Sequence, residues 1–346
     1  MYEKYFGMRE QPFGVTPDPR FLYLSAAHRE ALASLYYGIE ANRGFLGLIA
    51  RPGMGKTTIL FHLLEKFRSS ARTAFLFQTQ CTSREFMRFL LAELGYESDG
   101  NDFVRMHEEF NRRLLQEARA GNRFIVVIDE AQNLDPSVLE TVRLLSDFET
   151  PRAKLMHIIL AGQPELADKL ASPGLAQLRQ RVSIVHGLEP LSAGEIKNYI
   201  EHRLRIAGYE GAPLFTSGVY GDIADFTEGI PRNINNFCFS ALSIACAMHK
   251  KIVDSETVKE VIADLDISKL TSDVPTDLAE SPYMPRRNPA PSTNGQNNHE
   301  ILSPTEAAAY MQQVAAKLKN WQNSLDKTIT GPRLGRVRAR TDVDRS

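Results

Sequence analysis

The stretch ARPGMGKTT, from Ala50 to Thr58, decides the fold of this chain. It stands between a short apolar run, FLGLIA at residues 45–50, and a segment with helical spacing, so we expect a strand, a glycine-rich turn and a helix in that order. Gly53 and Gly55 allow the backbone to curve so that consecutive N–H groups face inward, and the helix that follows adds the partial positive charge of its N-terminus. The stretch therefore predicts a loop that binds phosphate groups.

Two side chains of this loop extend the prediction to ATP with Mg²⁺. Lys56 is expected to reach the β- and γ-phosphates, and the Thr57 hydroxyl is expected to ligate the metal. The usual P-loop pattern begins with glycine, whereas this chain has Ala50. A methyl group is tolerated there if Ala50 closes the strand in a β conformation, but not if the turn requires a positive φ. The expected nucleotide contacts are Pro52, Gly53, Met54, Gly55, Lys56, Thr57 and Thr58.

A second motif, FIVVIDEAQNL at residues 124–134, complements this loop. It is an apolar strand pattern that ends in Asp129 and Glu130, and it resembles a Walker B strand. Asp129 is expected to hold Mg²⁺ through water, and Glu130 to polarise the attacking water. This division of roles favours ATP hydrolysis over phosphoryl transfer to a substrate hydroxyl. The alternative is an exposed acidic turn.

Apolar runs and helical segments alternate along residues 25–190. The first helix is expected to begin at Ser25, a natural N-cap, and to end near Gly44. Strands are expected at 45–50, 73–78, 124–129, 155–162 and 182–188, with helices near 83–95, 102–120 and 136–148 and further short helices between the last two strands. Because the strands are apolar throughout, they favour a parallel sheet that is buried on both faces. The prediction is a three-layer α/β domain of the P-loop NTPase type.

The segments that flank this domain have a different character. Residues 1–24 are rich in proline, glycine and aromatic side chains, which is typical of an ordered extended arm. Residues 191–266 lose the strand pattern and carry only helical segments, which predicts a small all-α lid domain.

The C-terminal extension is expected to be mostly disordered. Residues 267–304 are rich in proline and polar side chains without apolar periodicity, which predicts a flexible linker. Residues 305–326 have apolar side chains at alternating spacings of four and three, which predicts an amphipathic helix. Such a helix needs a partner, which is the rest of this chain, a second copy or another protein. Residues 327–346 predict a basic disordered tail, with contact to nucleic acid or anionic lipid as the less favoured alternative.

The composition of the 346 residues argues against several protein classes. A net charge of −1 argues against a polycationic nucleic-acid coat, and three cysteines without ligand spacing argue against a disulfide framework or structural zinc. Neither an apolar leader nor a transmembrane run occurs, so we expect a cytoplasmic protein that reaches the inner membrane only through a partner. His28, His157 and His186 have no second ligand at metal spacing and are expected to be surface or hydrogen-bonded side chains.

The order of the motifs resembles that of an AAA+ ATPase. After the P-loop and the Asp-Glu strand come a strand that ends Gly162-Gln163, the segment LRQR at 178–181, and GIPRNIN at 229–235 in the helical region. The arm YFGMREQPFGVTPDPRFLYLSAAHREAL and the segments IDEAQNL, VRLLSDFET and LAGQPEL further resemble the general secretion pathway protein A type. The resemblance covers residues 1–266.

This resemblance implies roles for residues outside the two motifs. Gln163 stands where the sensor 1 residue touches the γ-phosphate or the attacking water. Arg181 resembles the arginine finger, which enters the site of a neighbouring subunit, and Arg179 is the alternative. Arg232 resembles sensor 2, which reports loss of the γ-phosphate. With Glu130 and Lys56 these are the expected catalytic residues, and a finger supplied in trans implies a homo-oligomer.

The function implied is an ATPase that assembles or remodels a protein complex, in envelope machinery for secretion, pili or exopolysaccharide. The rival is a DNA-linked AAA+ ATPase of the origin-recognition or transposition-helper type, but such initiators often add a winged-helix domain after the lid. A GTPase would carry Asn-Lys-x-Asp, which this sequence lacks. A small-molecule kinase would have little use for Glu130 or Arg181. A protein that only binds nucleotide stays open, because of Ala50 and the unusual sensor 1 glutamine.

Overall fold

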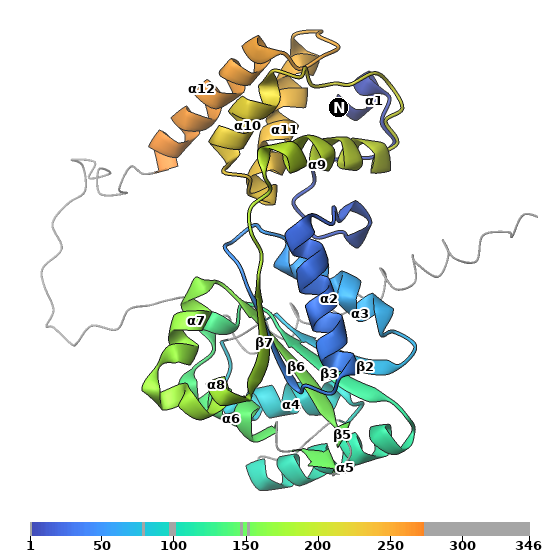
Figure 1. The fold of residues 1–346 in the computed structure, drawn as a ribbon, viewed down its shortest axis with the longest axis vertical. Coiled ribbons are helices and arrows are strands. Elements are labelled where there is room, and N and C mark those ends of the chain that lie inside the picture. The colour runs from blue at the N-terminus through green and yellow to red at the C-terminus, as the bar shows by residue number, and fades with distance from the viewer. Residues whose placement is uncertain (1, 78–79, 97–101, 146–147, 151–152, 273–346) are drawn as a thin grey trace, which may run out of the picture. The chain divides into compact units, whose positions relative to one another are not determined.

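The computed structural model describes residues 2–77, 80–96, 102–145, 148–150 and 153–272. Within these ranges the main sheet has the strand order β2-β3-β6-β1-β7, and all neighbouring strands in it are parallel. The strands are β1 (Phe45–Ile49), β2 (Ala71–Leu76), β3 (Arg123–Ile128), β6 (Met156–Gly162) and β7 (Val182–Gly187), drawn in Figure 1. The predicted parallel sheet is confirmed.

Helices cover both faces of the sheet, because alternate residues of a strand face opposite sides. Strand β3 shows this alternation: Ile125 and Val127 pack into one core, and Phe124 and Val126 into the other, all at most 1% exposed. The first core also contains residues of α2 (Ala26–Glu40) and α3 (Lys56–Lys66). The second contains residues of α4 (Ser83–Glu93), α5 (Phe103–Arg119), α6 (Pro136–Leu145), α7 (Pro164–Ala171) and α8 (Ala176–Arg181). The domain therefore has the three layers that the sequence predicts.

The helical region follows β7, as expected, and consists of α9 (Ala193–Ile206), α10 (Val219–Thr227), α11 (Pro231–Ala247) and α12 (Ser255–Ser272). Ser192 and Glu195 form a capping box that starts α9. Between α10 and α11, Gly229 has a φ of +67°, and a Cβ there would lie 2.2 Å from the Leu191 carbonyl oxygen. Only glycine fits this approach, which fixes the start of α11 against the end of the α/β domain.

The N-terminal arm departs from the extended conformation that we predicted. Tyr2–Phe6 form a helix, α1, and Pro19–Phe21 form a 3₁₀ turn, η1. Tyr2, Phe6 and Phe13 are buried in the core of the helical region, and α1 lies beside α11 in Figure 1. A helix of one turn is stable only through such tertiary packing, so local spacing could not reveal it. The arm is therefore part of the core of the helical region.

Other elements differ from prediction at their ends. Strand β2 begins at Ala71 rather than at residue 73, and α12 continues past residue 266 to Ser272. A short antiparallel pair, β4 (Glu149–Thr150) and β5 (Ala153–Lys154), and the 3₁₀ turn η2 (Ala131–Asn133) had no counterpart in the prediction, whereas the 3₁₀ turn η3 (Pro173–Leu175) lies with α7 and α8 where short helices were expected. The predicted linker beyond Ser272, the amphipathic helix and the basic tail lie outside the described residues. In the described ranges, no helix combines the length and apolar character that crossing a membrane requires.

Candidate nucleotide-binding site

The P-loop joins β1 to α3 at the carboxyl end of the sheet. The Ala50 N–H donates to the Gly162 carbonyl at 3.0 Å, which continues the pairing of β1 with β6, and Ala50 does not have a positive φ. Alanine at the first position of the motif is therefore compatible with the loop. Gly53 and Gly55 do have positive φ, +80° and +88°, as the predicted turn requires.

Lys56, the first residue of α3, lies beneath the loop and is 6% exposed. Its Nζ donates to the carbonyl oxygens of Ala50 at 2.9 Å and Arg51 at 3.4 Å. Burial lowers the pKa of Lys56, against the opposing effect of the negative charges of Glu130 and Asp129. The structure thus brings the predicted phosphate-binding cation close to the predicted acid pair.

Asp129 directly follows β3 and is hydrogen-bonded to Thr57 of the P-loop. Its Oδ2 accepts a hydrogen bond from the Thr57 hydroxyl at 2.6 Å, and its Oδ1 accepts one from the Glu130 N–H at 3.0 Å. Burial raises the pKa of Asp129, and these hydrogen bonds oppose that shift. A hydroxyl and a carboxylate side by side are oxygen donors that suit Mg²⁺ bound mainly by phosphate and water. The residues present therefore fit the metal, and in the described ranges no three His, Cys, Asp or Glu side chains form a separate metal cluster.

Glu130 has a left-handed backbone, with φ 52° and ψ 38°, which is uncommon for a residue other than glycine. Its Oε2 accepts hydrogen bonds from the side-chain amides of Gln132 at 2.6 Å and Gln163 at 3.1 Å. Burial by itself would raise the pKa of Glu130, but the two amides and the charges of Lys56 and Arg232 lower it below the usual value. The carboxylate is therefore ionised at neutral pH and able to polarise a water molecule.

Gln132 is a site residue that the sequence analysis missed. Besides its bond to Glu130, its Oε1 accepts from the Gln163 N–H at 3.1 Å, so that one amide joins the turn after β3 to the N-cap of α7. Lys169 fixes the same turn by donating to the Gln132 carbonyl. A Cβ at Gly162 would lie 2.7 Å from Gln132 Oε1, so the glycine leaves room for the amide. The sequence signal that could have identified Gln132 was the place of its amide two residues after Glu130.

The helical region closes the other side of the pocket through Arg232. The Arg232 N–H donates to the Gly53 carbonyl at 3.2 Å, and a Cβ at Gly53 would lie 2.7 Å from Arg232 Cβ. Beside this contact, Arg51 and Glu228 form an ion pair at 3.1 Å. The positive charge predicted for sensor 2 thus lies beside the P-loop.

The N-terminal arm forms a further wall, since residues 14–18 and 21–23 line the same pocket. Arg203 of α9, which is 9% exposed, holds this wall: its Nε donates to the Pro12 carbonyl at 2.6 Å, and its guanidinium lies 4.9 Å from the centre of the Phe21 ring. Arg203 also donates to the Tyr199 hydroxyl, which in turn donates to Asn235 Oδ1. A buried polar network therefore ties the arm to α9 and α11.

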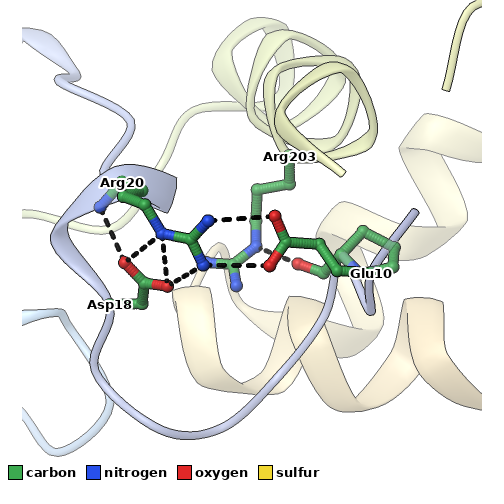
Figure 2. Close-up of polar contacts among 5 residues, drawn as sticks. Glu10, Asp18, Arg20 and Arg203 are labelled. Carbon is green, nitrogen blue, oxygen red and sulfur yellow. Dashed lines mark hydrogen bonds and ion pairs between the residues drawn. The ribbon is translucent and has the colours of Figure 1, made fainter. Parts of the chain in front are cut away.

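An exposed cluster stabilises the turn of the arm itself. Figure 2 shows Arg20 between two carboxylates, at 2.6 Å from Asp18 and 2.9 Å from Glu10, with Arg203 behind them. Asp18 also accepts from the Arg20 N–H at 2.9 Å, which caps η1. These contacts thus link Glu10 to Asp18 across the part of the arm that leads to the pocket.

Arg181 and Arg179 lie away from this pocket, on α8 before β7. Arg181 lines a separate pocket at the amino end of the strands, together with Arg43 and Lys154. Strands β1 and β7 are parallel, and the P-loop follows the carboxyl end of β1, five residues along the strand. At 3.3 Å per residue this separates Arg181 from the P-loop of its own chain by about 16 Å.

The three histidines named from the sequence differ in their surroundings. His28 is buried, lines the nucleotide pocket and is hydrogen-bonded at both ring nitrogens. His157 is 1% exposed and neither ring nitrogen has a partner, so the prediction of a surface or hydrogen-bonded side chain is wrong for it. His186 is partly exposed, with Nδ1 3.4 Å from the Gly187 carbonyl oxygen.

Sequence comparisons agree with this geometry. A family model described as an AAA domain matches residues 39–170, which include the P-loop and the acid pair. General secretion pathway protein A of Aeromonas hydrophila is 39% identical over 254 residues, which are 71% of this chain and 45% of that protein. An uncharacterized HTH-type transcriptional regulator of Methanocaldococcus jannaschii is 31% identical over 280 residues, 69% of this chain and 66% of that protein. The chain thus spans less than half the length of the Aeromonas protein.

The fold has counterparts among solved structures. The ORC2 protein of Aeropyrum pernix, in its ADPNP-ADP complexes, has a TM-score of 0.58 at 15% identity, over 74% of this chain and 72% of that chain. At this identity the likeness concerns the fold alone. The family match covers the P-loop and the acid pair, and the 254 residues matched in the Aeromonas relative extend beyond that domain. The chain therefore carries an AAA domain and is similar to General secretion pathway protein A over 71% of its length.

Proposed function

We propose that this chain binds ATP with Mg²⁺ at the loop from Gly53 to Thr58 and hydrolyses the ATP to ADP and phosphate. The observation that carries this proposal is the Thr57–Asp129 contact of 2.6 Å, with Glu130 beside it in the hydrogen bonds of two glutamine amides. These contacts join the phosphate loop, a metal-binding oxygen pair and an ionised carboxylate in one site. Each is needed for hydrolysis, and together they favour it over binding alone.

Binding relies on the loop and on α3. The N–H groups of residues 53–58 and the helix N-terminus provide fixed partial positive charge, and Lys56 turns from the Ala50 carbonyl toward the β- and γ-phosphates. Thr57 and Asp129 would hold Mg²⁺, Asp129 through water, and the ion would supply positive charge to the phosphate oxygens.

Hydrolysis relies on Glu130. Its carboxylate accepts a proton from the water that attacks the γ-phosphorus, and the lowered pKa keeps the group ionised for this role. Gln132 holds the carboxylate in place, and Gln163 contacts the same oxygen from the end of β6. A glutamine amide in the sensor 1 position thus orients both the base and the water. Arg232 adds positive charge from the helical region.

The catalytic site is completed by a second copy of the chain. The separation of Arg181 from its own P-loop supports a role as an arginine finger for a neighbouring subunit, and such a residue stabilises charge that develops in the transition state. The active form is therefore a homo-oligomer. A lone subunit binds ATP and hydrolyses it slowly.

The cellular role that we propose is ATP-driven assembly or remodelling of a cell-envelope complex from the cytoplasmic side. The 39% identity to General secretion pathway protein A supports this role. A DNA-linked role is the second candidate, because the archaeal relative is described as an HTH-type transcriptional regulator. A pulldown with duplex DNA distinguishes the two roles. The second candidate would be favoured if the protein bound DNA at low salt, dissociated when salt was added, and hydrolysed ATP faster with DNA present.

The biochemical proposal is tested with a fluorescent ATP analogue and a phosphate-release assay. Wild-type protein is expected to bind the analogue with Mg²⁺ and to release phosphate. Lys56→Ala is expected to lose affinity by about 100-fold or more, since it removes a charge that contacts the phosphates. Equal affinity in the two proteins would contradict the proposal. GTP in place of ATP serves as the control for base selection.

A further inference from the structure

A buried histidine lies behind the P-loop. His28 is in the first turn of α2 and is 3% exposed. Its Nδ1 is 2.7 Å from Ser25 Oγ, and its Nε2 is 3.1 Å from the Met54 carbonyl oxygen. A carbonyl only accepts, so Nε2 carries the hydrogen, and Nδ1 of the neutral ring then accepts from the Ser25 hydroxyl. Burial lowers the pKa of His28, which favours this neutral form. Both ring nitrogens thus have fixed roles.

The Met54 carbonyl, to which His28 is hydrogen-bonded, belongs to a peptide group that can rotate more easily than most. Met54 lies between Gly53 and Gly55, both at positive φ, and glycine accepts φ of either sign at little cost. The peptide between Met54 and Gly55 can therefore rotate as a unit more readily than an ordinary peptide. In a planar trans peptide the C=O and the N–H point in opposite directions. Holding the Met54 carbonyl toward His28 consequently fixes the Gly55 N–H on the opposite side.

This orientation matters for a loop that binds anions. An inward N–H attracts a phosphate oxygen, whereas a flipped peptide would present the Met54 carbonyl oxygen in its place and repel the phosphate. The side chain of Met54 is 1% exposed and anchors the residue, but it does not fix the peptide that follows it. The hydrogen bond from His28 supplies that restraint.

The helical region also contacts the start of α2, close to His28. Glu195 of α9 accepts a hydrogen bond from the Ala26 N–H at 3.2 Å, and it caps its own helix through Ser192. Glu195 is the charged group that acts on His28, from the element packed against the start of α2. His28 therefore lies where the first turn of α2, the P-loop and the helical region join.

We infer that His28 is a positioning residue of the P-loop, which keeps the Met54 carbonyl turned away so that the Gly55 N–H remains available to a phosphate oxygen. This inference rests on the proposed function, since it concerns the affinity of the same loop for the phosphate chain. His28 does not touch the reacting atoms. Its removal weakens binding of any ligand that carries the phosphate chain, whatever the base.

The test compares variants of His28 in the full chain. His28→Gln keeps an amide donor near the position of Nε2. His28→Asn keeps a polar group near Nδ1 but is too short to reach Met54, and His28→Phe keeps the ring without a donor. His62→Phe, at a half-buried histidine of α3 itself, is the matched control. The probes are a fluorescent ATP analogue and inorganic tripolyphosphate, each with Mg²⁺, together with the KM and kcat for ATP.

We expect His28→Phe and His28→Asn to weaken both probes about tenfold, because a buried carbonyl loses its donor and the loop loses its restraint. His28→Gln is expected to stay within about threefold of wild type, and His62→Phe within about twofold. KM should rise with the dissociation constant while kcat changes less than about threefold, since the interaction acts on binding rather than on the chemical step.

Two failures are distinguishable. If wild type and Lys56→Ala bind neither probe, the proposed function and this inference fall together. If wild type binds and the His28 variants bind equally well, the function stands and the role of His28 is refuted. Where His28→Phe does not fold, the Gln and Asn variants decide: equal affinities, or a loss of ATP affinity without a loss of tripolyphosphate affinity, contradict the inference.

Discussion

The two edges of the main sheet carry different chemistry. At the carboxyl edge, Lys56, Asp129 and Glu130 lie together, and hydrogen bonds to loop carbonyls, a hydroxyl and two amides fix them. At the amino edge, the basic side chains of Arg43, Lys154 and Arg181 line a separate pocket. Parallel strands keep the two sets apart along the whole length of β1. Within one chain, therefore, the expected arginine finger and the P-loop lie at opposite ends of the strands.

The largest effect is expected from Arg181→Ala, which removes charge from the amino edge. If Arg181 acts on a neighbour, turnover should fall about 10³-fold while ATP affinity is unchanged, because the arginine stabilises charge only in the transition state. Arg179→Ala is the matched control, since the Arg179 guanidinium donates to the Ala171 carbonyl on its own chain. Steady-state phosphate release and titration with the ATP analogue measure the two quantities.

A mixture of two variant subunits tests whether Arg181 acts on a neighbouring chain. Arg181→Ala and Glu130→Gln subunits should each be inactive, yet a mixture should regain part of the activity at interfaces that pair an intact acid with an intact arginine. A mixed oligomer that forms but shows no recovery would show that Arg181 does not act in trans. If Arg179→Ala lost more turnover than Arg181→Ala, Arg179 rather than Arg181 would be the arginine finger.

The next effect concerns Glu130 at the carboxyl edge. Glu130→Gln is expected to lower turnover by between about 10²-fold and 10³-fold with ATP binding retained, since the amide cannot accept the proton from water. Glu165→Gln, in the first turn of α7, is a matched carboxylate control and should stay within about twofold of wild type. Single-turnover phosphate release is the measurement. Hydrolysis at the wild-type rate by Glu130→Gln would remove Glu130 from the mechanism.

A smaller effect is expected from acid, through His157 near the amino end of β6. Burial, with a lesser contribution from the Arg123 charge, lowers the pKa of His157 to about 4. The unfolded chain takes up this proton first, at a pKa of about 6.5, so stability is complete above that pH and falls as the pH drops toward 4. The loss is about 2 kcal/mol by pH 5, which is about a 30-fold change in the unfolding equilibrium.

Urea unfolding at pH 7.5 and pH 5 measures this change. His157→Leu, which has no group to protonate, should lose less stability than wild type over the same interval. Equal losses in the two proteins would show that His157 is not the acid-sensitive group.

The smallest effect is expected from Glu228→Gln, at the junction of the carboxyl edge with the helical region. The Arg51–Glu228 pair is exposed, at 48% and 64% for the two side chains, and exposed pairs contribute at most about 1 kcal/mol. ATP affinity should therefore change no more than about twofold, and a double-mutant cycle with Arg51→Gln should give a coupling near zero. A tenfold change would show that this pair, rather than the Arg232–Gly53 contact, fastens the helical region to the P-loop.

The parts of the candidate site that consist of consecutive residues could be predicted from the sequence. The P-loop and the Asp-Glu strand are each a few consecutive residues, and the alternation of β3 is visible in its own sequence. Gln132, Arg203 and His28 could not be predicted in the same way. Gln132 bonds to a backbone 31 positions away, and Arg203 to one 191 positions away. Nothing in the neighbouring sequence distinguishes Arg203 and His28 from other side chains of their type, and for Gln132 the signal was only its place two residues after Glu130.

The same reason explains the arm. Its aromatic residues indicated order, but only the packing of Tyr2 and Phe13 in the helical region shows where the arm lies and why it is helical at its start. The predicted roles of Gln163, Arg181 and Arg232 stay predictions. The structure places Gln163 in a hydrogen bond with Glu130, Arg232 in the lining of the nucleotide pocket, and Arg181 at the opposite edge of the sheet.

The sequence by itself determined the order of strand, glycine turn and helix, the acid pair after β3, and hence a parallel sheet with a phosphate loop at its carboxyl end. These features depend on backbone conformation and on periodicity, which act over a few residues. The tertiary structure decided that the arm lines the pocket, that His28 holds the loop, and that Arg181 lies beyond reach of its own site. Such relations arise from burial and hydrogen bonds between distant segments, which are fixed only when the whole core packs.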